Sequence, residues 1–259
     1  MRDPNPKVAG SGFTRLQACG ITVDFGLLEA QARELNIGFF SRMEHGSPWL
    51  RLKIAASMDG VTALQNGISQ WITSESTRHD VQHWRARSCA ILTGIGTVLA
   101  DNPALNVREF DIGRQPLRVV VDSRLRLTST SKILQGSGVL VACCDDSTPN
   151  GARLCDAGAE ILAVPGDNGK VDLSALLKEL AQREINDVLV EAGSILNGAL
   201  LQANLVNELL LYFAPTLLGA NARGMFDFPA LYAMSQRIEL DIFSLDRIGI
   251  DLRLRARPK

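Results

Sequence analysis

Asp187-Val-Leu-Val-Glu-Ala-Gly-Ser194, followed directly by Ile195-Leu-Asn-Gly-Ala-Leu-Leu201, is the stretch that indicates the fold most clearly. The pattern predicts a buried strand that ends in Glu191, turns at Gly193 and opens a helix with Ser194 as its N-cap. Such a turn directs free amides and the positive helix end at an anion, and it places Glu191 where parallel sheets bind ligands. An ordinary strand-to-helix turn with a surface glutamate explains the same residues equally well.

Strand and helix patterns alternate on both sides of this unit. Their alternation predicts an α/β fold with a mainly parallel central sheet. The C-terminal ranges 238–243 and 248–254 flank Ser244-Leu-Asp-Arg247 and predict an antiparallel hairpin that closes one edge of the sheet. The other expected strands are 50–56, 90–93, 118–122, 138–142, 160–164, 187–191 and 209–214, and the expected helices are 74–88, 173–184 and 194–204.

The first 45 residues form a short segment of their own, because the turn residues Glu44-His-Gly-Ser-Pro48 separate them from the alternating region. Apolar residues recur there every three or four positions and predict one helix with a single apolar face. They are Leu28, Ala32, Leu35, Phe39 and Met43. So short a segment cannot close a core, so we expect it to pack on the main domain or on something absent from this chain.

Composition excludes several classes of protein. The net charge of -1 gives no general attraction for nucleic acid or anionic lipid. No apolar run approaches the roughly 20 residues that span a bilayer, and the start lacks the apolar stretch of a signal peptide. The five cysteines are odd in number and lack Cys-x-x-Cys spacing, so we expect reduced thiols in a cytoplasmic protein.

The first predicted strand of the main domain carries a lysine among aliphatic residues. Leu50, Leu52 and Ile54 alternate with Arg51 and Lys53, so Lys53 points to the face opposite the three aliphatics. In a central strand this cation must find a carboxylate, a polar ligand or water, because an unpaired buried charge is costly. An edge-strand lysine in water is the alternative, and the sequence does not separate the two.

Polar loops and a helix follow this strand, and some of their side chains are candidates for ligand contact. Trp71, close to Ser69, either stacks on a flat ring or belongs to the core. Arg85 either holds a phosphate through its planar guanidinium or stays solvated. His79 and His83 lie four residues apart without the carboxylate or cysteine partners of a metal shell, so we expect no metal site.

A second glycine-rich turn follows the predicted strand 90–93. Gly94-Ile-Gly96 lets backbone amides approach an anion, with Thr97 near the start of a short helical stretch. This is half of a dinucleotide-binding fingerprint, although Gly-x-Gly is also an ordinary turn.

Six motifs, in this order between Trp49 and about Arg255, together resemble the reductase domain of the bifunctional deaminase/reductase of riboflavin biosynthesis. They are Leu52-Lys-Ile-Ala-Ala-Ser-Met-Asp-Gly60, Ser69-Gln-Trp-Ile-Thr-Ser74, Arg85-Ala-Arg-Ser-Cys-Ala-Ile-Leu-Thr93, Thr97-Val-Leu-Ala-Asp-Asn-Pro-Ala-Leu105, Val121-Asp-Ser123 and Val190-Glu-Ala-Gly193. The resemblance implies a fold like that of dihydrofolate reductase, with helices on both faces of the sheet. It also implies reduction of 5-amino-6-(5-phosphoribosylamino)uracil to its ribitylamino product with NADPH.

The same resemblance implies which residues bind each ligand. Its motifs place Ser69, Arg85, Leu105, Arg108 and Glu191 at the substrate, whose phosphate needs arginines such as Arg85 and Arg108. Lys53 becomes a candidate for stabilising or protonating the reacting sugar, with Glu191 and Asp101 as competing acid/base candidates. The residues implied to contact NADPH are Ala55, Trp71, Thr97, Asp101, Ser123, Gly193, Ser194, Ile195, Leu196, Asn197, Gly198 and Ala199.

Residues 1–45 resemble the tail of that family's N-terminal zinc deaminase, and residues 46–259 resemble its reductase domain. The His-x-Glu and Pro-Cys-x-x-Cys elements of the deaminase are absent from the sequence, so we expect no deaminase activity and a truncated or partial gene product. Two alternatives remain, a catalytically silent NADPH-binding or dimerisation module and a pterin reductase of the same fold. We expect a homodimer, because 209–214 is apolar enough for edge pairing and this family tends to dimerise through this domain.

Overall fold

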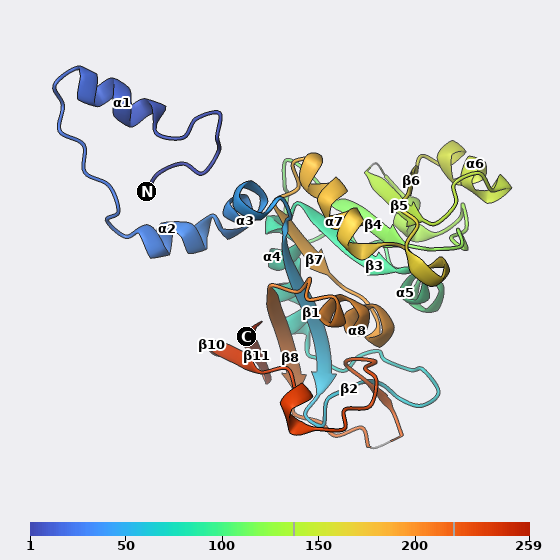
Figure 1. Ribbon diagram of the computed structural model, residues 1–259. Coiled ribbons are helices and arrows are strands. Elements are labelled where there is room, and N and C mark those ends of the chain that lie inside the picture. Colours follow the sequence, from blue (N-terminus) through green and yellow to red (C-terminus); the bar gives the residue numbers. More distant parts are fainter. Residues whose placement is uncertain (137, 220) are drawn as a thin grey trace.

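The computed structural model describes residues 1–136, 138–219 and 221–259, and a mixed sheet lies at its centre (Figure 1). Aliphatic side chains of the central strands are buried on both faces of this sheet. Within these residues nine strands lie in the order β10-β11-β8-β1-β7-β3-β4-β5-β6. The strands from β8 to β6 run parallel, and β10 and β11 pair antiparallel at one edge. The predicted architecture, including the C-terminal hairpin, is therefore confirmed. The strands are β1 (Trp49–Ser57), β3 (Ala90–Gly94), β4 (Leu117–Val121), β5 (Val139–Cys143), β6 (Glu160–Ala163), β7 (Asp187–Val190), β8 (Glu208–Ala214), β10 (Leu240–Ile248) and β11 (Asp251–Pro258).

Helices cover both faces of this sheet, as the resemblance implies. On one face Leu176 and Leu200 pack with Leu52 in the largest core cluster. On the other face Trp84 packs with Leu189 in a separate cluster. The first face carries α7 (Leu173–Gln182) and α8 (Ser194–Gln202), and the second carries α4 (Glu75–Arg87), α5 (Ile95–Asp101) and α6 (Pro149–Asp156).

Two details of the predicted edge are wrong. The range Ser244 to Arg247 lies within β10 instead of forming the hairpin turn, and the chain reverses at Gly249, whose φ is 61°. Polar residues are tolerated there because β10 is the outermost strand and is largely exposed. The apolar strand β8 is not an edge, since it is bonded to β1 on one side and to β11 on the other.

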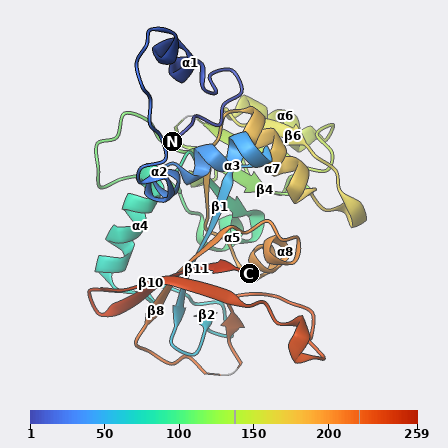
Figure 2. The same ribbon diagram turned by 60° about the vertical axis from the view of Figure 1, so that its left-hand side comes forward.

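The N-terminal segment does not form the single amphipathic helix that its spacing predicts. It contains α1 (Ser11–Ala18), α2 (Glu29–Leu35) and α3 (Ile37–His45), and the helix is interrupted at Asn36. Helix α3 packs against the sheet, because Gly38 allows an approach so close that a Cβ there would lie 2.3 Å from Asp187 Oδ2. In Figures 1 and 2, α1 lies away from the sheet, and Glu34 of α2 pairs with Arg257 of β11 at 2.6 Å.

The long connection between β8 and β10 crosses back over the carboxyl edge of the sheet. Its strand β9 (Arg223–Gly224) pairs with β2 (Val61–Ala63), which follows β1. Asp59 accepts hydrogen bonds from the amides of Leu218 and Gly219, at 3.1 Å and 2.8 Å, and so fixes the start of this connection. Short 3-10 helices complete the structure at η1 (Lys132–Leu134), η2 (Asp167–Gly169) and η3 (Met234–Gln236).

Candidate active site

The carboxyl ends of β3 and β7 lie beside each other at one edge of the sheet. The two strands are parallel neighbours, with Leu92 opposite Val190. The chain leaves β3 through α5 on one face of the sheet and leaves β7 through α8 on the other face. Strands whose following helices diverge in this way form the topological switch point at which α/β sheets bind ligands.

Both helices begin at this switch point without a side-chain cap. Their N-caps are Gly94 and Gly193, so the prediction of Ser194 as the N-cap is wrong by one residue. A Cβ on Gly94 would lie 3.3 Å from Leu196 Cδ2, and one on Gly193 would lie 3.9 Å from Thr97 Oγ1. The two helix starts therefore lie side by side, and the first amides of an uncapped helix need an outside partner. This donor set fits a pyrophosphate group.

The predicted coenzyme run from Gly193 to Ala199 divides into two parts. Ile195 is 72% exposed, whereas Asn197 and Gly198 are buried. Asn197 Nδ2 donates to the carbonyl oxygens of Ala192 and Met225, at 3.3 Å and 3.2 Å. A Cβ on Gly198 would lie 2.2 Å from the Asp227 carbonyl oxygen. Asn197 and Gly198 thus hold the β8–β10 connection against α8, and the exposed part of the run lies at the start of the helix.

Glu191 is the centre of a buried charge cluster directly after β7. Arg85 of α4 donates to it from Nε at 2.6 Å and from Nη2 at 3.0 Å. Lys53 Nζ lies 3.8 Å from Glu191 Oε2, and the three side chains are between 12% and 16% exposed. Because β1 lies between β8 and β7, the edge-strand alternative for Lys53 is wrong. The structure thus brings Lys53, Arg85 and Glu191 together.

Burial and charge shift the protonation equilibria of this cluster. Burial alone would raise the pKa of Glu191, but Arg85 and Lys53 outweigh it and lower that pKa to about 2. Burial lowers the pKa of Lys53, and the positive charge of Arg85 lowers it further, against the opposing effect of Glu191. The carboxylate is therefore held ionised, while the lysine releases its proton more readily than a lysine in water.

The loop after α5 carries the remaining substrate candidates. Leu105 has a φ of 47° and a buried side chain, so only its backbone can face a ligand. Arg108 is exposed, and its charge helps to lower the pKa of Glu191, which places it near the cluster. The fork of Arg85 is already occupied by Glu191 and by the Asn106 carbonyl oxygen at 3.2 Å. Arg108 is thus the arginine whose guanidinium is better placed for an incoming anion.

The loop between β2 and α4 presents the candidate ring-stacking residue. Trp71 is 70% exposed, which rules out the core alternative for this side chain. The guanidinium of Arg78 lies 4.7 Å from the centre of the Trp71 ring and also donates to the Thr73 carbonyl oxygen. Ser69 is half-buried in the same loop, and Ala55 is half-buried on the Lys53 side of β1.

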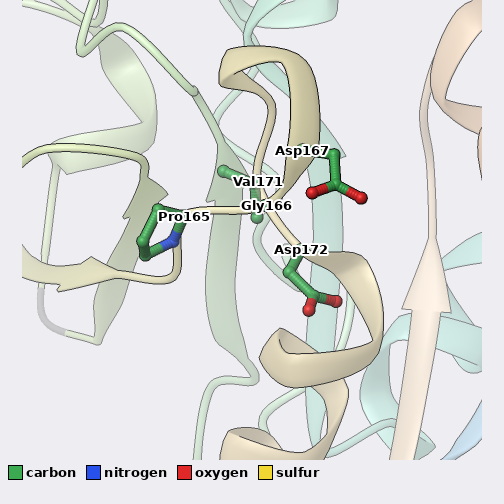
Figure 3. A pocket seen from close by; sticks show the side chains of 5 residues that line it. All are labelled: Pro165, Gly166, Asp167, Val171 and Asp172. Atoms are coloured by element: carbon green, nitrogen blue, oxygen red, sulfur yellow. The ribbon is translucent and has the colours of Figure 1, made fainter.

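Two further candidates lie away from the cluster. Asp101 is exposed at the end of α5, and among the described residues it makes no hydrogen bond or ion pair with Lys53 or Glu191. Ser123 follows β4, and its Oγ accepts from the Val171 amide at 3.2 Å. Val171 lines a shallow polar hollow with the carboxylates of Asp167 and Asp172, shown in Figure 3. Ser123 therefore borders an acidic surface.

Asp80 of α4 makes half-buried contacts that the sequence does not reveal. It accepts from the hydroxyl of Tyr212 at 2.5 Å, from Arg253 Nη1 at 3.0 Å and from Trp84 Nε1 at 3.3 Å. These contacts attach α4, and with it Arg85, to β8 and β11. A single acidic residue in a polar helix gives no sequence signal for these contacts, because Tyr212 and Arg253 are more than 130 residues away from it.

Two searches of the described ranges found nothing. No group of three or more His, Cys, Asp or Glu side chains in the part of the chain that the structure describes is arranged to hold a metal ion. No helix there has both the length and the apolar character needed to cross a bilayer.

Comparison with known proteins gives a consistent result. The family described as the RibD C-terminal domain matches residues 48–252. The riboflavin biosynthesis protein RibD of Escherichia coli (strain K12) is 43% identical over 266 residues, which cover 98% of this chain and 72% of that protein.

Solved structures agree with this match. Form 1 of Acinetobacter baumannii RibD is 43% identical and has a TM-score of 0.91, covering 100% of this chain and 71% of its own. A Thermotoga maritima structure is 27% identical with a TM-score of 0.84, covering 100% of this chain and 70% of its own. That protein is described as a diaminohydroxyphosphoribosylaminopyrimidine deaminase/5-amino-6-(5-phosphoribosylamino)uracil reductase.

Proposed function

The chain belongs to the RibD C-terminal domain family, and on this premise we propose that it reduces 5-amino-6-(5-phosphoribosylamino)uracil to 5-amino-6-(5-phosphoribitylamino)uracil with NADPH. Membership places it at the reduction step of riboflavin biosynthesis, which requires a nicotinamide coenzyme. The observation that carries the proposal is the buried cluster of Lys53, Arg85 and Glu191 at the switch point of the sheet. It supplies a proton source and anion-binding groups beside a site for a dinucleotide.

The substrate side of the proposal follows from charge. Arg108 would hold the phosphate, because its guanidinium is exposed and close to the cluster. Glu191 would accept hydrogen bonds from ribose hydroxyls or the pyrimidine ring, because its low pKa keeps it ionised. Lys53 would deliver the proton that the reduction consumes, because burial weakens its hold on that proton. Ser69 and the Leu105 backbone complete the proposed substrate contacts.

The coenzyme side rests on the helix starts. The free amides at Gly193 and Gly94 would hold the pyrophosphate, and Thr97 lies between them. Trp71, Ala55 and Ser123 are the other proposed contacts. When bound, NADPH supplies the hydride for C1′ of the ring-opened sugar.

The partner proposal is a second copy of the chain. Within the described residues β10 is bonded to another strand only through β11, so its other edge is free. Leu245 and Ile242 on this strand are 63% and 57% exposed, which is unusual for an unpaired edge. A homodimer through β10 would cover both the free edge and these side chains.

Two smaller proposals complete this assignment. Residues 1–45 would belong to the region that adjoins the deaminase part in bifunctional relatives, since Leu27 and Leu28 are 89% and 63% exposed there. A cytoplasmic location would keep the five free cysteines reduced.

A steady-state assay tests the proposed reaction directly. Purified protein is mixed with freshly deaminated substrate, and the consumption of NADPH is followed with and without that substrate. The expected result is oxidation of NADPH that depends on the substrate, with a lower KM for NADPH than for NADH. Tight coenzyme binding by calorimetry without turnover would instead support a silent binding module and refute the proposed reaction.

The phosphate assignment has its own test. Arg108→Ala should raise the KM for the substrate about 10- to 100-fold, the range expected for loss of a charged hydrogen bond. The KM for NADPH should stay the same in this variant. An unchanged substrate KM would remove Arg108 from the proposed phosphate site.

A further inference from the structure

The loop that carries Arg108 is held by one face of α4 and by Gln115, whose side chain accepts from the Val107 amide at 2.9 Å and donates to the Val107 carbonyl oxygen at 3.0 Å. We call residues 106–110 the phosphate loop. Arg85 Nη1 donates to the Asn106 carbonyl oxygen at 3.2 Å, and the Arg108 amide donates to Gln82 Oε1 at 3.2 Å. Gln82 is 3% exposed, so this acceptor is fixed in the interior. The backbone on both sides of Val107 is thereby attached to the helix.

Aromatic rings hold the far end of the same loop. The ring of Phe110 lies 4.2 Å from that of His83, centre to centre, and 5.3 Å from that of His79. The two imidazoles are 5.0 Å apart in an edge-to-face arrangement. His79 Nδ1 also lies 2.5 Å from Glu109 Oε2. Phe110, His79 and His83 therefore form a ring cluster on the outer face of α4.

This ring cluster has no other assignment. Within the described ranges neither His79 nor His83 makes a hydrogen bond or ion pair with Lys53 or Glu191, and the sequence alone suggests only surface residues. The ion pair between His79 and Glu109 is at the rim, since these side chains are 54% and 41% exposed, and pairs so exposed contribute little. The packing of Phe110 against His83 is thus the main contact at this end of the loop.

The helix beneath the ring cluster is a rigid support. Its start is fixed by Asp251, which accepts from the Ser74 hydroxyl and the Thr77 hydroxyl at 2.7 Å each. Its middle is fixed by Asp80 through Tyr212 and Arg253, as described above. A loop clamped to this face therefore keeps a constant position relative to Arg85 and Glu191.

We propose that His83 is a positioning residue, whose ring, packed against Phe110, holds the phosphate loop so that Arg108 reaches the substrate's phosphate. This inference deepens the proposed function and rests on it. The contribution comes from the flat ring and its packing, and the charge of the imidazole is not needed. A phenylalanine at the same position should therefore replace it.

The test compares His83→Ala with His83→Phe. The readouts are the KM and kcat for the phosphorylated substrate and for the same compound with its phosphate removed. His45→Ala is the matched control, because His45 is the remaining histidine and lies exposed at the end of α3. Thermal unfolding of each variant confirms that it is folded.

His83→Ala should raise the KM for the phosphorylated substrate about three- to tenfold, the range expected for loss of an aromatic pair. Its kcat and its kinetics with the dephosphorylated compound should match those of the wild type, as should every parameter of His83→Phe and His45→Ala. An equal rise in KM for both compounds would overturn the proposal, because the loop would then not act through the phosphate. A rise in His83→Phe as large as that in His83→Ala would also overturn it, because the imidazole itself would then be required.

Arg108→Ala separates this inference from the function on which it rests. If Arg108→Ala raises the substrate KM and His83→Ala does not, the positioning role is wrong and the phosphate assignment stands. If neither variant changes the KM, the phosphate assignment itself has failed.

Discussion

Replacing Glu191 by glutamine removes one negative charge from the cluster and leaves its shape almost unchanged. Arg85 and Lys53 would then face each other without the carboxylate between them, at side-chain exposures of 12% and 16%. Uncompensated buried charge is among the costliest changes that a protein interior can undergo. We therefore expect Glu191→Gln to affect stability as well as activity.

The size of the effect follows from the pKa of Glu191. That pKa falls from 4.5 to about 2 on folding. Each pKa unit corresponds to about 1.4 kcal/mol, so the ionised carboxylate stabilises the fold by about 3 kcal/mol near neutral pH. Because the pKa in the folded state is the lower one, this stabilisation is complete above the unfolded value and is lost as the pH falls toward 2. Glu191→Gln lacks this carboxylate, so its stability should show no such loss as the pH falls.

Urea unfolding across this pH range is the measurement. Wild type should exceed Glu191→Gln by about 3 kcal/mol at neutral pH, and this gap should close as the pH falls from 4.5 toward 2. Glu160→Gln is the control, because Glu160 pairs with Arg183 at 2.6 Å but is 55% exposed. Its cost should stay below about 1 kcal/mol. A gap between wild type and Glu191→Gln that does not change with pH would refute the assignment of the stabilisation to the ionised carboxylate.

Three other substitutions test separate parts of the structure. Lys53→Met should lower kcat by about 100-fold or more while calorimetry shows unchanged NADPH binding, because the proton source is lost and the helix starts remain; an unchanged kcat would exclude Lys53 as the proton donor. Gly198→Ala should destabilise the protein by about 2 kcal/mol in thermal unfolding and raise the KM for NADPH. The new Cβ would lie 2.2 Å from the Asp227 carbonyl oxygen and would displace the β8–β10 connection. An unchanged melting temperature would show that this close approach is not required. Leu245→Lys should convert a dimer to a monomer in light scattering without loss of subunit stability, since this side chain is 63% exposed, and a variant that stays dimeric would place the interface elsewhere.

The regular part of the fold could be predicted because buried parallel strands have a simple pattern. The strand expected at 50–56 is observed at Trp49–Ser57, and that expected at 160–164 at Glu160–Ala163. Elements that depend on distant partners could not be predicted. The pairing of Val61 with Gly224 joins residues far apart in the chain, and neither strand is long enough to show a period.

One missed element did carry a local signal. Helix α6 begins with Thr148 as N-cap, whose side chain accepts from the Gly151 amide, and Pro149 occupies the first helical position. This order is typical of a helix start. The neighbouring Asn150 and Gly151 are also typical of a turn, so this signal is ambiguous in the sequence.

The sequence predicts which residue types belong to the candidate site, but it does not predict which of them contact one another. Alternation along the first strand places Lys53 on the correct face, but its partner depends on strand order and register. Only the pairing of Leu52 with Val190 brings Glu191 beside it. The sequence motifs likewise suggest both Arg85 and Arg108 as phosphate ligands without distinguishing them. In the structure Arg85 is bonded to Glu191, whereas Arg108 is exposed.

That difference has a physical consequence for how the site would select a phosphate ester. Two N–H groups of the Arg85 guanidinium already donate to Glu191. Its positive charge still attracts an anion, but it cannot form a second bidentate pair with the same N–H groups. Arg108 keeps an exposed guanidinium, yet it extends from a loop and would lose much conformational freedom on binding. Fixing the loop backbone through Gln82 and Phe110 removes part of that loss before the substrate arrives. Affinity for the phosphate should therefore depend on residues that never touch it.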